Sequence, residues 1–524
     1  MSSGIHHVTL ITRKVQANVD FYLGFLGLRL VKRTGGFEDA SQLHLFYGDG
    51  AASPGSLITF LVWEDGSPGR VGHGAPSEVA FSIAPEAIGF WLTRALQFHV
   101  TVSGPAQEFG EPVLRLTDPD GIIVKLVGSR QQEAVVPWAS EGIAAENAVQ
   151  RLRGATILSE KPAETIAFLE QHTGFVAGPE QAGVRRLTSE ALDVIDVRNA
   201  SGFWTAAPGT GTIDHIALRA ADRRHVEVVR DALEVGPHGP VSAHDRKYFY
   251  SLYVREPGGT LIELASDGPG FAIDEPIDSL GTQLFLPPHA LADGDDATML
   301  PQFSLPGEER IVYRDLPFVH RIHVPEHPDG TTLLLLHGTG GNEASLLPLG
   351  RRLLAHATLI GVRGRSTEEG VARFFRRFSD ARFDQGDIAA EAEAFAAFVE
   401  ETRLAYGVDL QRAAFLGYSN GANMLGAVML LRPGVVRHAV LLRAMNVVEH
   451  PQAYGPQGHA LIVTGAHDPY GVHAAELQTH LLQAGIELTI ETVSAAHEIG
   501  PADEAIAGGW LGDVLAHRRT GEAN

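Results

Sequence analysis

Two short stretches of the sequence carry side chains that could do chemistry. The stretch GIHHVTLITRK places His6 and His7 side by side at the start of an alternating apolar run. Imidazole is a common metal ligand, but a histidine on a strand is more often a buried or surface residue without such a role. The stretch GYSNG fits the pattern G-x-S-x-G, with Ser419 at its centre. Either stretch indicates a site only if it has partners elsewhere in the chain.

Partners for Ser419 follow it in the order nucleophile, acid, base that α/β-hydrolases use. Asp468 lies in TGAHDPY and His497 in SAAHEIG, each after an apolar run. We expect His497 to take the Ser419 proton and Asp468 to orient the imidazole, although singly they could be turn and loop residues. The Gly-rich turn in LLLLHGTGGNE predicts an oxyanion hole from the backbone N–H groups of Thr339 and Asn420.

Strands and helices must alternate to position these residues. The run TTLLLLHG is typical of a strand buried on both faces of a parallel sheet, and AAFLGYSNGANMLGAVMLL of a strand, a tight turn and a helix. We therefore expect an α/β-hydrolase domain with a mainly parallel sheet over residues 310–520. This half resembles the carboxylesterase/phospholipase family, close to acyl-protein thioesterases, which implies a small ester or thioester substrate. Residues 363–388 resemble the substrate-side loop of esterases encoded beside hydroquinone dioxygenases, but could equally form a solvated helix.

Residues 1–266 read as one βαββ-type module written four times. The copies open with the strand-like runs IHHVTLIT, PSEVAFSI, LRGATILS and IDHIALRA. Two copies close with the similar phrases LTDPDGIIVKLVG and REPGGTLIELAS, in which a Pro/Gly turn joins two alternating runs. Such a repeat is a signal about the fold as a whole.

The repeat resembles the vicinal-oxygen-chelate superfamily of glyoxalases and extradiol dioxygenases. The resemblance implies an α+β fold in which four βαββ modules form two vicinal-oxygen-chelate domains around a metal. It also implies that the ligands come from the opening and closing strands of modules. His7, Glu78, Ala155 and His215 hold the opening positions, and Glu263 holds the closing position of the fourth module.

Only His7, His215 and Glu263 then combine two imidazoles with a carboxylate, because the closing position of the second module is Lys125. This set suits Fe(II), with Mn(II) as the alternative, and leaves coordination positions open for substrate and dioxygen. Taken singly, His7 could be a surface imidazole, His215 a core residue and Glu263 a solvated carboxylate.

The pattern further resembles the hydroquinone-type ring-cleaving dioxygenases, which lack a histidine at the position of Ala155. In that group, the residues matching Arg246 and Tyr253 in HDRKYFYSLYVREPGGTLIE line the substrate site. Similar enzymes use the residue matching His6 as an acid/base or orienting group, with an exposed strand residue as the alternative. Asp214 stands where some of these enzymes carry a histidine, and it could orient the neighbouring ligand.

These resemblances imply a bifunctional enzyme, an Fe(II)-dependent dioxygenase that opens hydroquinone-type rings and is fused to a serine carboxylesterase or thioesterase. Two alternatives keep the same hydrolase. The N-terminal half could be a glyoxalase-like isomerase or lyase that uses nickel or zinc without dioxygen. It could also be a quinone- or drug-binding resistance protein, a class that typically lacks the complete ligand set.

Length and composition bound the remaining possibilities. A chain of 524 residues exceeds one hydrophobic core, and we expect vicinal-oxygen-chelate domains at 1–135 and 148–290, followed by a linker at 291–309. The net charge of −22 argues against a nucleic-acid partner. Cysteine is absent, which excludes thiolate ligands and fits the cytoplasm, and neither a signal peptide nor a membrane span is evident. The expected partners are an aromatic substrate, dioxygen and an ester, and a homo-oligomer is left open.

Overall fold

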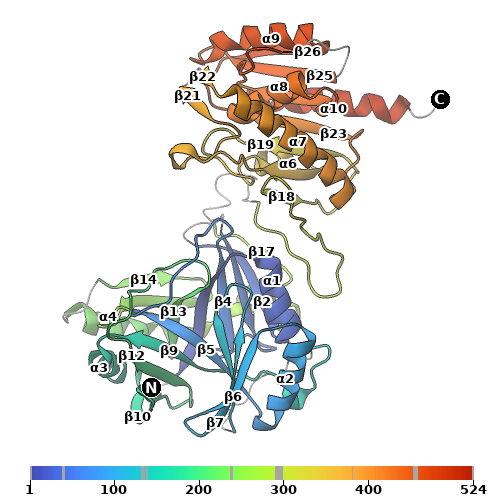
Figure 1. Ribbon diagram of the computed structural model, residues 1–524. Helices are drawn as coiled ribbons and strands as arrows, with labels where there is room; N and C mark the ends of the chain where they lie inside the picture. The colour runs from blue at the N-terminus through green and yellow to red at the C-terminus, as the bar shows by residue number, and fades with distance from the viewer. Residues whose placement is uncertain are drawn as a thin grey trace. The chain divides into compact units, whose positions relative to one another are not determined.

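The computed structural model describes most of the chain as two compact units (Figure 1). The described residues are 3–37, 42–130, 136, 138, 140–235, 240–288, 299–379, 382–451 and 458–521. We call Met1–Arg310 the N-terminal unit and Ile311–Asn524 the C-terminal unit, and describe each by itself. Within the described residues, no helix has the length and apolarity that crossing a membrane requires.

The N-terminal unit repeats one order of elements: a strand, a helical segment and three further strands. The first pass is β1 (Ile5–Thr12), α1 (Val15–Val19), β2 (Arg29–Gly35), β3 (Leu43–Gly48) and β4 (Leu57–Val62). The second is β5 (Ala75–Ile83), α2 (Ile88–Gln97), β6 (Val102–Glu108), β7 (Glu111–Thr117) and β8 (Ile123–Gly128). The third is β9 (Leu152–Ser159), α3 (Pro162–Thr173), β10 (Val176–Gln181), β11 (Val184–Thr188) and β12 (Val194–Asn199). The fourth is β13 (Thr212–Ala220), α4 (Arg223–Val235), β14 (Ser242–Asp245), β15 (Phe249–Arg255) and β16 (Leu261–Pro269). Each of these four modules has three strands after its helix, one more than the predicted βαββ pattern.

Two sheets contain these strands. One sheet combines the first and fourth modules, and the other combines the second and third. One sheet has the order β14-β15-β16-β13-β1-β4-β3-β2-β17, and the other β10-β11-β12-β9-β5-β8-β7-β6. The antiparallel pairs β1–β13 and β5–β9 therefore join the first module to the fourth and the second to the third. The predicted domains 1–135 and 148–290 instead group the first with the second and the third with the fourth. Because the opening strands pair with each other, none of the four forms an exposed sheet edge. Sequence patterns do not reveal which opening strands pair.

The segment after β16 packs back onto the N-terminal unit. β17 (Leu284–Phe285) adds to the sheet beside β2, and Phe271 is buried against it in a small apolar cluster. Of the predicted linker 291–309, residues 291–298 lie outside the described residues. In the remainder, Leu300 joins the main core and Ser304 exchanges two hydrogen bonds with Gln16. Residues 299–309 therefore pack against the N-terminal unit.

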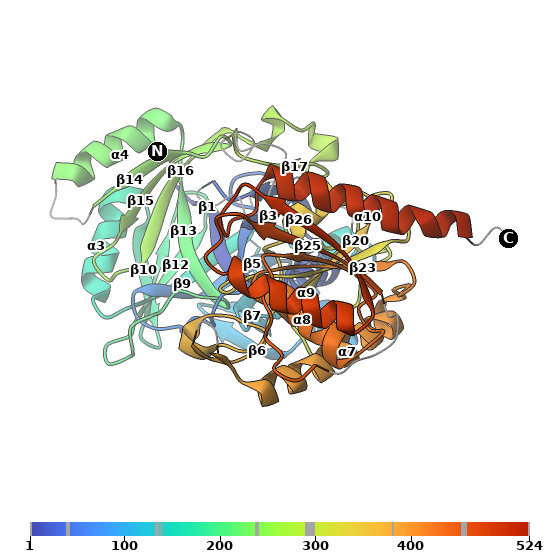
Figure 2. The same ribbon diagram turned by 90° about the horizontal axis from the view of Figure 1, so that it is seen from above.

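The C-terminal unit is a sheet covered by helices on both faces. Its strand order is β18-β20-β19-β23-β24-β25-β26, and all neighbours are parallel except β18 with β20. The strands are β18 (His320–His323), β19 (Thr332–Leu336), β20 (Thr358–Val362), β23 (Ala413–Tyr418), β24 (His438–Leu442), β25 (Gly458–Gly465) and β26 (Ile486–Val493). Helices α7 (Gln385–Tyr406), α8 (Asn420–Leu431) and α9 (Ala474–Gln483) lie on one face, and α6 (Leu347–Leu353) and α10 (Pro501–Gly521) on the other (Figures 1 and 2). Every residue of β19 is buried, as expected for a central strand.

A buried ion pair connects α10 to the end of β24. Arg443 follows the strand and donates two hydrogen bonds to Asp503, at 2.7 and 3.0 Å. Both side chains are within 1% of complete burial, so each ion depends on its partner for the interactions that water would otherwise supply. On the same helix, Glu504 makes a comparable pair with Arg352 at the surface, at 2.8 and 2.9 Å.

Replacing Asp503 by asparagine is expected to lower the free energy of unfolding of the C-terminal unit by about 3–5 kcal/mol, because a buried guanidinium loses its counter-ion. Glu504→Gln is the matched control and is expected to cost less than about 1 kcal/mol, since its pair is solvated. Calorimetry on the full chain measures both, with the transition of the N-terminal unit as internal reference. Equal losses in the two variants would contradict the role assigned to burial.

Candidate functional site

Three predicted ligands come together because of the register of three neighbouring strands. On β13, Ala217 pairs with His7 of β1 on one side and with Glu263 of β16 on the other. His215 lies two residues before Ala217 and therefore faces the same side of the sheet.

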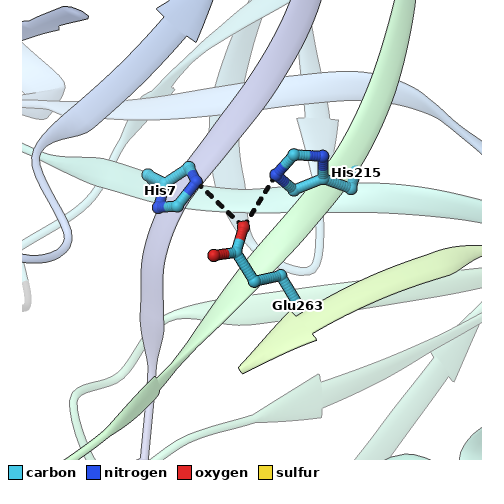
Figure 3. A group of neighbouring side chains, drawn as sticks. All are labelled: His7, His215 and Glu263. Carbon is cyan, nitrogen blue, oxygen red and sulfur yellow. Dashed lines mark ion pairs between the residues drawn. The ribbon is translucent and has the colours of Figure 1, made fainter. Parts of the chain in front are cut away.

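The three side chains converge on one point at this face of the sheet (Figure 3). Glu263 Oε2 lies 3.2 Å from His7 Nε2 and 2.8 Å from His215 Nε2. All three residues are buried, and their ligand atoms lie within 4.8 Å of one another. No other group of metal-ligating side chains with this geometry occurs among the residues that the structure describes.

The chemistry of this cluster fits a divalent cation. His215 Nε2 and Glu263 Oε2 are buried and face each other at 2.8 Å, and neither atom has a hydrogen-bond partner outside the cluster among the described residues. Burial alone would raise the pKa of Glu263, but the imidazoles of His7 and His215 outweigh it and hold that pKa well below its usual range. The carboxylate is therefore ionised and the two imidazoles point toward it, a donor set that suits Fe(II) or Mn(II).

Side chains behind the ligands fix their orientation. Asp214 Oδ2 lies 2.7 Å from His215 Nδ1, and Ser251 Oγ donates to Glu263 Oε1 at 2.5 Å. His6 Nδ1 lies 3.0 Å from His7 Nδ1. If His7 offers Nε2 to a metal, its proton is on Nδ1 and His6 accepts it. His6 is 2% exposed, so its alternative reading as an exposed strand residue is wrong.

The predicted substrate-side residues Arg246 and Tyr253 lie beside the ligand cluster. Tyr253 pairs with Glu263 in the register of β15 and β16, and its ring contacts His215 edge to face at 5.4 Å. The Arg246 guanidinium carbon is 5.5 Å from the centre of the Tyr253 ring. Burial and the nearby Glu263 carboxylate raise the pKa of Tyr253, so the phenol keeps its proton and can donate it in a hydrogen bond.

Sequence reasoning missed His44, which belongs to the same site. This residue of β3 lies 3.1 Å from Thr59 Oγ1 through its Nε2. Burial lowers the pKa of His44 to about 3, and the imidazoles of His7 and His215 add to that effect. The available signal was its place in LHLFYG, where a histidine alternates with buried apolar residues.

The second sheet carries a different set at the corresponding positions. Lys125 occupies the closing position, is buried, and forms ion pairs with Glu78 and Glu108 at 3.3 Å and with Asp196 at 4.0 Å. Ala155 supplies no ligand atom. An ammonium group therefore sits among the carboxylates of this sheet, which accounts for the single metal-like cluster among the described residues.

The C-terminal unit brings Ser419, His497 and Asp468 into one chain of hydrogen bonds. His497 Nε2 lies 2.9 Å from Ser419 Oγ, and its Nδ1 lies 2.9 Å from Asp468 Oδ2. The three residues follow β23, β26 and β25, so they meet at the carboxyl end of the parallel sheet. This geometry lets the imidazole accept the hydroxyl proton while the carboxylate holds the ring.

Ser419 sits on a strained turn between β23 and α8. Its φ of 51° is in the left-handed region, where a residue other than glycine is unfavourable. The two glycines of GYSNG are required for space, because a Cβ at Gly421 would lie 2.1 Å from the Leu336 carbonyl and one at Gly417 2.5 Å from Ala422 N. The backbone thus lifts the hydroxyl out of the sheet.

A cavity of about 250 Å³ opens beside Ser419 and His497. Thr339 and Asn420, the two residues predicted for the oxyanion hole, both line it. Residues 363–388 also contribute, and they form β21 (Arg377–Ser379) and β22 (Arg382–Phe383) before the start of α7, with no helix longer than three residues ahead of it in the described residues. The alternative reading of this stretch as a solvated helix is therefore wrong.

Arg443 was not found from the sequence and supports the base of the triad. Besides its pair with Asp503, it donates to the carbonyl oxygens of Ala496 and Glu498, at 2.9 and 2.8 Å. These carbonyls flank His497, so the guanidinium fixes the loop on both sides of the imidazole. Its signal in the sequence is weak, because an arginine after a strand usually has a solvated side chain.

Comparisons with known proteins agree with the fold of the N-terminal half. Residues 4–126 match the family "Glyoxalase/Bleomycin resistance protein/Dioxygenase superfamily". The chain is 35% identical over 313 residues to "Putative ring-cleaving dioxygenase MhqO" of Bacillus subtilis (strain 168), covering 59% of this chain and 97% of the relative. It is 30% identical over 298 residues to "Chlorohydroquinone/hydroquinone 1,2-dioxygenase" of Sphingobium indicum, covering 54% and 91%. A crystal structure of a dioxygenase-like protein from Bacillus subtilis superposes with a TM-score of 0.56 at 32% identity, over 58% of this chain and 98% of the other.

The C-terminal half has relatives of its own. It is 32% identical over 188 residues to "Putative hydrolase MhqD" of Bacillus subtilis (strain 168), covering 35% of this chain and 93% of that protein. This chain covers MhqO and MhqD almost completely, and it does so with different parts. The chain therefore belongs, through its N-terminal half, to the glyoxalase/bleomycin resistance protein/dioxygenase superfamily alongside ring-cleaving dioxygenases, and carries a relative of hydrolases as its C-terminal half.

Proposed function

We propose that the chain is a bifunctional enzyme that opens hydroquinone-type aromatic rings with dioxygen and hydrolyses carboxylic esters or thioesters. The observation that carries this proposal is that His7, His215 and Glu263 converge at a buried point, although His7 lies more than two hundred residues before the other two. A relative that acts on chlorohydroquinone and hydroquinone supports the substrate class. The Ser419–His497–Asp468 geometry supports the hydrolase.

In the first reaction, His7, His215 and Glu263 would hold Fe(II). That ion would supply the dioxygen activation and redox chemistry that ring opening needs. Tyr253 keeps its proton and donates a hydrogen bond to a phenolic oxygen, while Arg246 stabilises a phenolate. Burial and, to a lesser degree, the neighbouring His7 lower the pKa of His6 to about 3, so His6 is neutral and acts as an acceptor.

In the second reaction, Ser419 Oγ attacks the carbonyl carbon of the ester. His497 takes the hydroxyl proton and passes it to the leaving alcohol or thiol, and Asp468 stabilises the imidazolium. The backbone N–H groups of Thr339 and Asn420 stabilise the negative charge on the carbonyl oxygen. Water then repeats the same steps to release the acid.

His7→Ala and Glu263→Ala are each expected to abolish oxygen uptake with methylhydroquinone and ferrous ion, because each removes one of three ligands. His99→Asn serves as the control, since His99 is exposed and asparagine tolerates its φ of 55°. An oxygen electrode together with metal analysis measures the outcome. Turnover without oxygen uptake on nickel or zinc, or hydroquinone binding without metal, would instead favour the lyase or the binding protein.

Metal affinity is expected to rise with pH. Burial lowers the pKa of His215, but the carboxylates of Asp214 and Glu263 outweigh it and raise that pKa to about 9 in the metal-free chain. A metal must displace this proton, so Mn(II) affinity should rise about tenfold per pH unit from pH 6 and level off near pH 9. Calorimetric titrations measure this, and Asp214→Asn should flatten the profile. Constant affinity between pH 6 and 8 would contradict the assignment.

Ser419→Ala is expected to abolish hydrolysis of a short 4-nitrophenyl ester, because the nucleophile is lost. Asp468→Asn should reduce kcat about 10⁴-fold, since it leaves the imidazole in the wrong tautomer. Release of 4-nitrophenolate measures both rates. Oxygen uptake by the same variants is the control and should match that of the unaltered chain; ester hydrolysis that survives Ser419→Ala would rule out this nucleophile.

A further inference from the structure

Tyr418 lies between three parts of the proposed hydrolase site. It is the second residue of GYSNG and the last residue of β23. It directly precedes Ser419, so its backbone belongs to the turn that carries the nucleophile. Its side chain contacts the loop of His497 and the turn before Thr339. The proposed mechanism gives this side chain no chemical step, so its contacts need another explanation.

The hydroxyl of Tyr418 holds the loop that carries the base. It donates a hydrogen bond to the backbone carbonyl oxygen of His497 at 3.0 Å. The two rings also contact each other, with their centres 5.6 Å apart and their planes inclined by 40°. Burial raises the pKa of Tyr418, so the phenol keeps its proton and remains a donor.

Three consecutive carbonyl oxygens of this loop accept hydrogen bonds from the end of the sheet. Arg443 donates to the carbonyls of Ala496 and Glu498, at 2.9 and 2.8 Å. Tyr418 donates to the carbonyl between them, which belongs to His497. The loop is therefore attached both to the end of β23 and to the residue after β24. The bond from β23 is the one at the residue that carries the imidazole.

The His497 imidazole depends on its backbone for a fixed position. Its side chain is 31% exposed, so the surrounding packing restricts it only in part. Its two nitrogens lie 2.9 Å from Ser419 Oγ and 2.9 Å from Asp468 Oδ2, which requires that the backbone keep its distance from both. A displacement of about 1 Å in a reacting group can lower a rate about 100-fold. A hydrogen bond to the carbonyl of the same residue restricts such a displacement.

The ring of Tyr418 also packs against the turn predicted to form the oxyanion hole. A Cβ at Gly338 would lie 2.8 Å from Cδ1 of this ring, so the missing side chain of Gly338 makes room for it. The backbone N–H of Thr339, one of the two predicted donors, belongs to the peptide unit that begins at Gly338. The same side chain is therefore in contact with the base and with the oxyanion turn.

We infer that Tyr418 is a positioning residue for ester hydrolysis, which holds the His497 imidazole where it can take the Ser419 proton and give it to the leaving alcohol. This inference rests on the proposed hydrolase function and adds a residue to it. The Tyr418 hydroxyl forms no bond to the substrate and transfers no proton. It acts through the backbone of His497, and its ring relates the oxyanion turn to the same strand end.

The test compares 4-nitrophenyl acetate with 4-nitrobenzyl acetate on the full chain. Both have the same acyl group, but 4-nitrophenolate leaves without a proton, whereas the benzylic alkoxide must receive one from His497. Tyr418→Phe keeps the ring and removes the hydrogen bond. Its kcat/KM should fall about threefold for the first ester and about tenfold or more for the second, because a displaced imidazole is both a weaker base and a weaker acid. Release of 4-nitrophenolate and of 4-nitrobenzyl alcohol measures the two rates.

Tyr406→Phe is the matched control in the same unit. The Tyr406 hydroxyl lies 2.7 Å from His320 Nε2 and accepts a hydrogen bond from the Arg314 N–H at 3.0 Å. Among the described residues that line the cavity beside Ser419, none of these three occurs. This variant also loses a bonded tyrosine hydroxyl, and its kcat/KM should stay within about twofold of the unaltered chain for both esters.

The difference between the two losses separates positioning from a general effect on folding. A smaller folded fraction lowers both rates by the same factor, so equal losses with the two esters would overturn the inference. Unchanged rates in Tyr418→Phe, or the same losses in Tyr406→Phe, would also overturn it. Tyr418→Met lacks the hydroxyl too and should show the same larger loss with the benzyl ester, so it decides if Tyr418→Phe does not fold.

The unaltered chain tests the function on which the inference rests. If it hydrolyses neither ester, the proposed hydrolase function fails. If it hydrolyses only the 4-nitrophenyl ester, the hydrolase remains but His497 does not supply a proton to the leaving group, and the role inferred for Tyr418 is wrong.

Discussion

The pairing of β1 with β13 is the contact on which the N-terminal unit depends. It joins the first and last modules across about two hundred residues of chain and places His7 and Glu263 on either side of Ala217. The ligand cluster is therefore a product of tertiary structure, since no local segment contains more than one of its three members. The hydrogen bonds that orient the ligands come from Asp214 of β13 and from Ser251 of the neighbouring β15 in the same sheet.

In the C-terminal unit, the positions of Ser419 and His497 depend on local backbone strain and on a buried ion pair. The turn at Ser419 adopts a left-handed φ, and the missing side chain of Gly421 allows a close approach to Leu336 of β19 while that of Gly417 leaves room for Ala422. The loop that carries His497 has no such backbone constraint. Arg443 holds it through hydrogen bonds to two carbonyl oxygens, and Asp503 neutralises the guanidinium. Helix α10 thereby contributes to the arrangement of the triad without lining the pocket.

Much of both sites was accessible from the sequence, and the limits have physical causes. The repeat made equivalent positions comparable, so His7, His215 and Glu263 could be chosen together, and the order of Ser419, Asp468 and His497 is a property of the hydrolase topology. Which modules pair could not be predicted, because all four opening strands have similar alternating patterns and compete for the same edges. His44 and Arg443 were missed for a related reason, since each acquires its partners only through long-range contacts.

The buried Lys125 has a consequence for how the chain responds to metal supply. Its ammonium group neutralises Glu78, Glu108 and Asp196 together with Arg115 and Arg186. These cations belong to the chain itself, so the second sheet has them as soon as it folds. If the first sheet binds a metal as proposed, its cation must come from solution. A chain made while that metal is scarce would then have only the second sheet electrostatically complete, and the first could be loaded later.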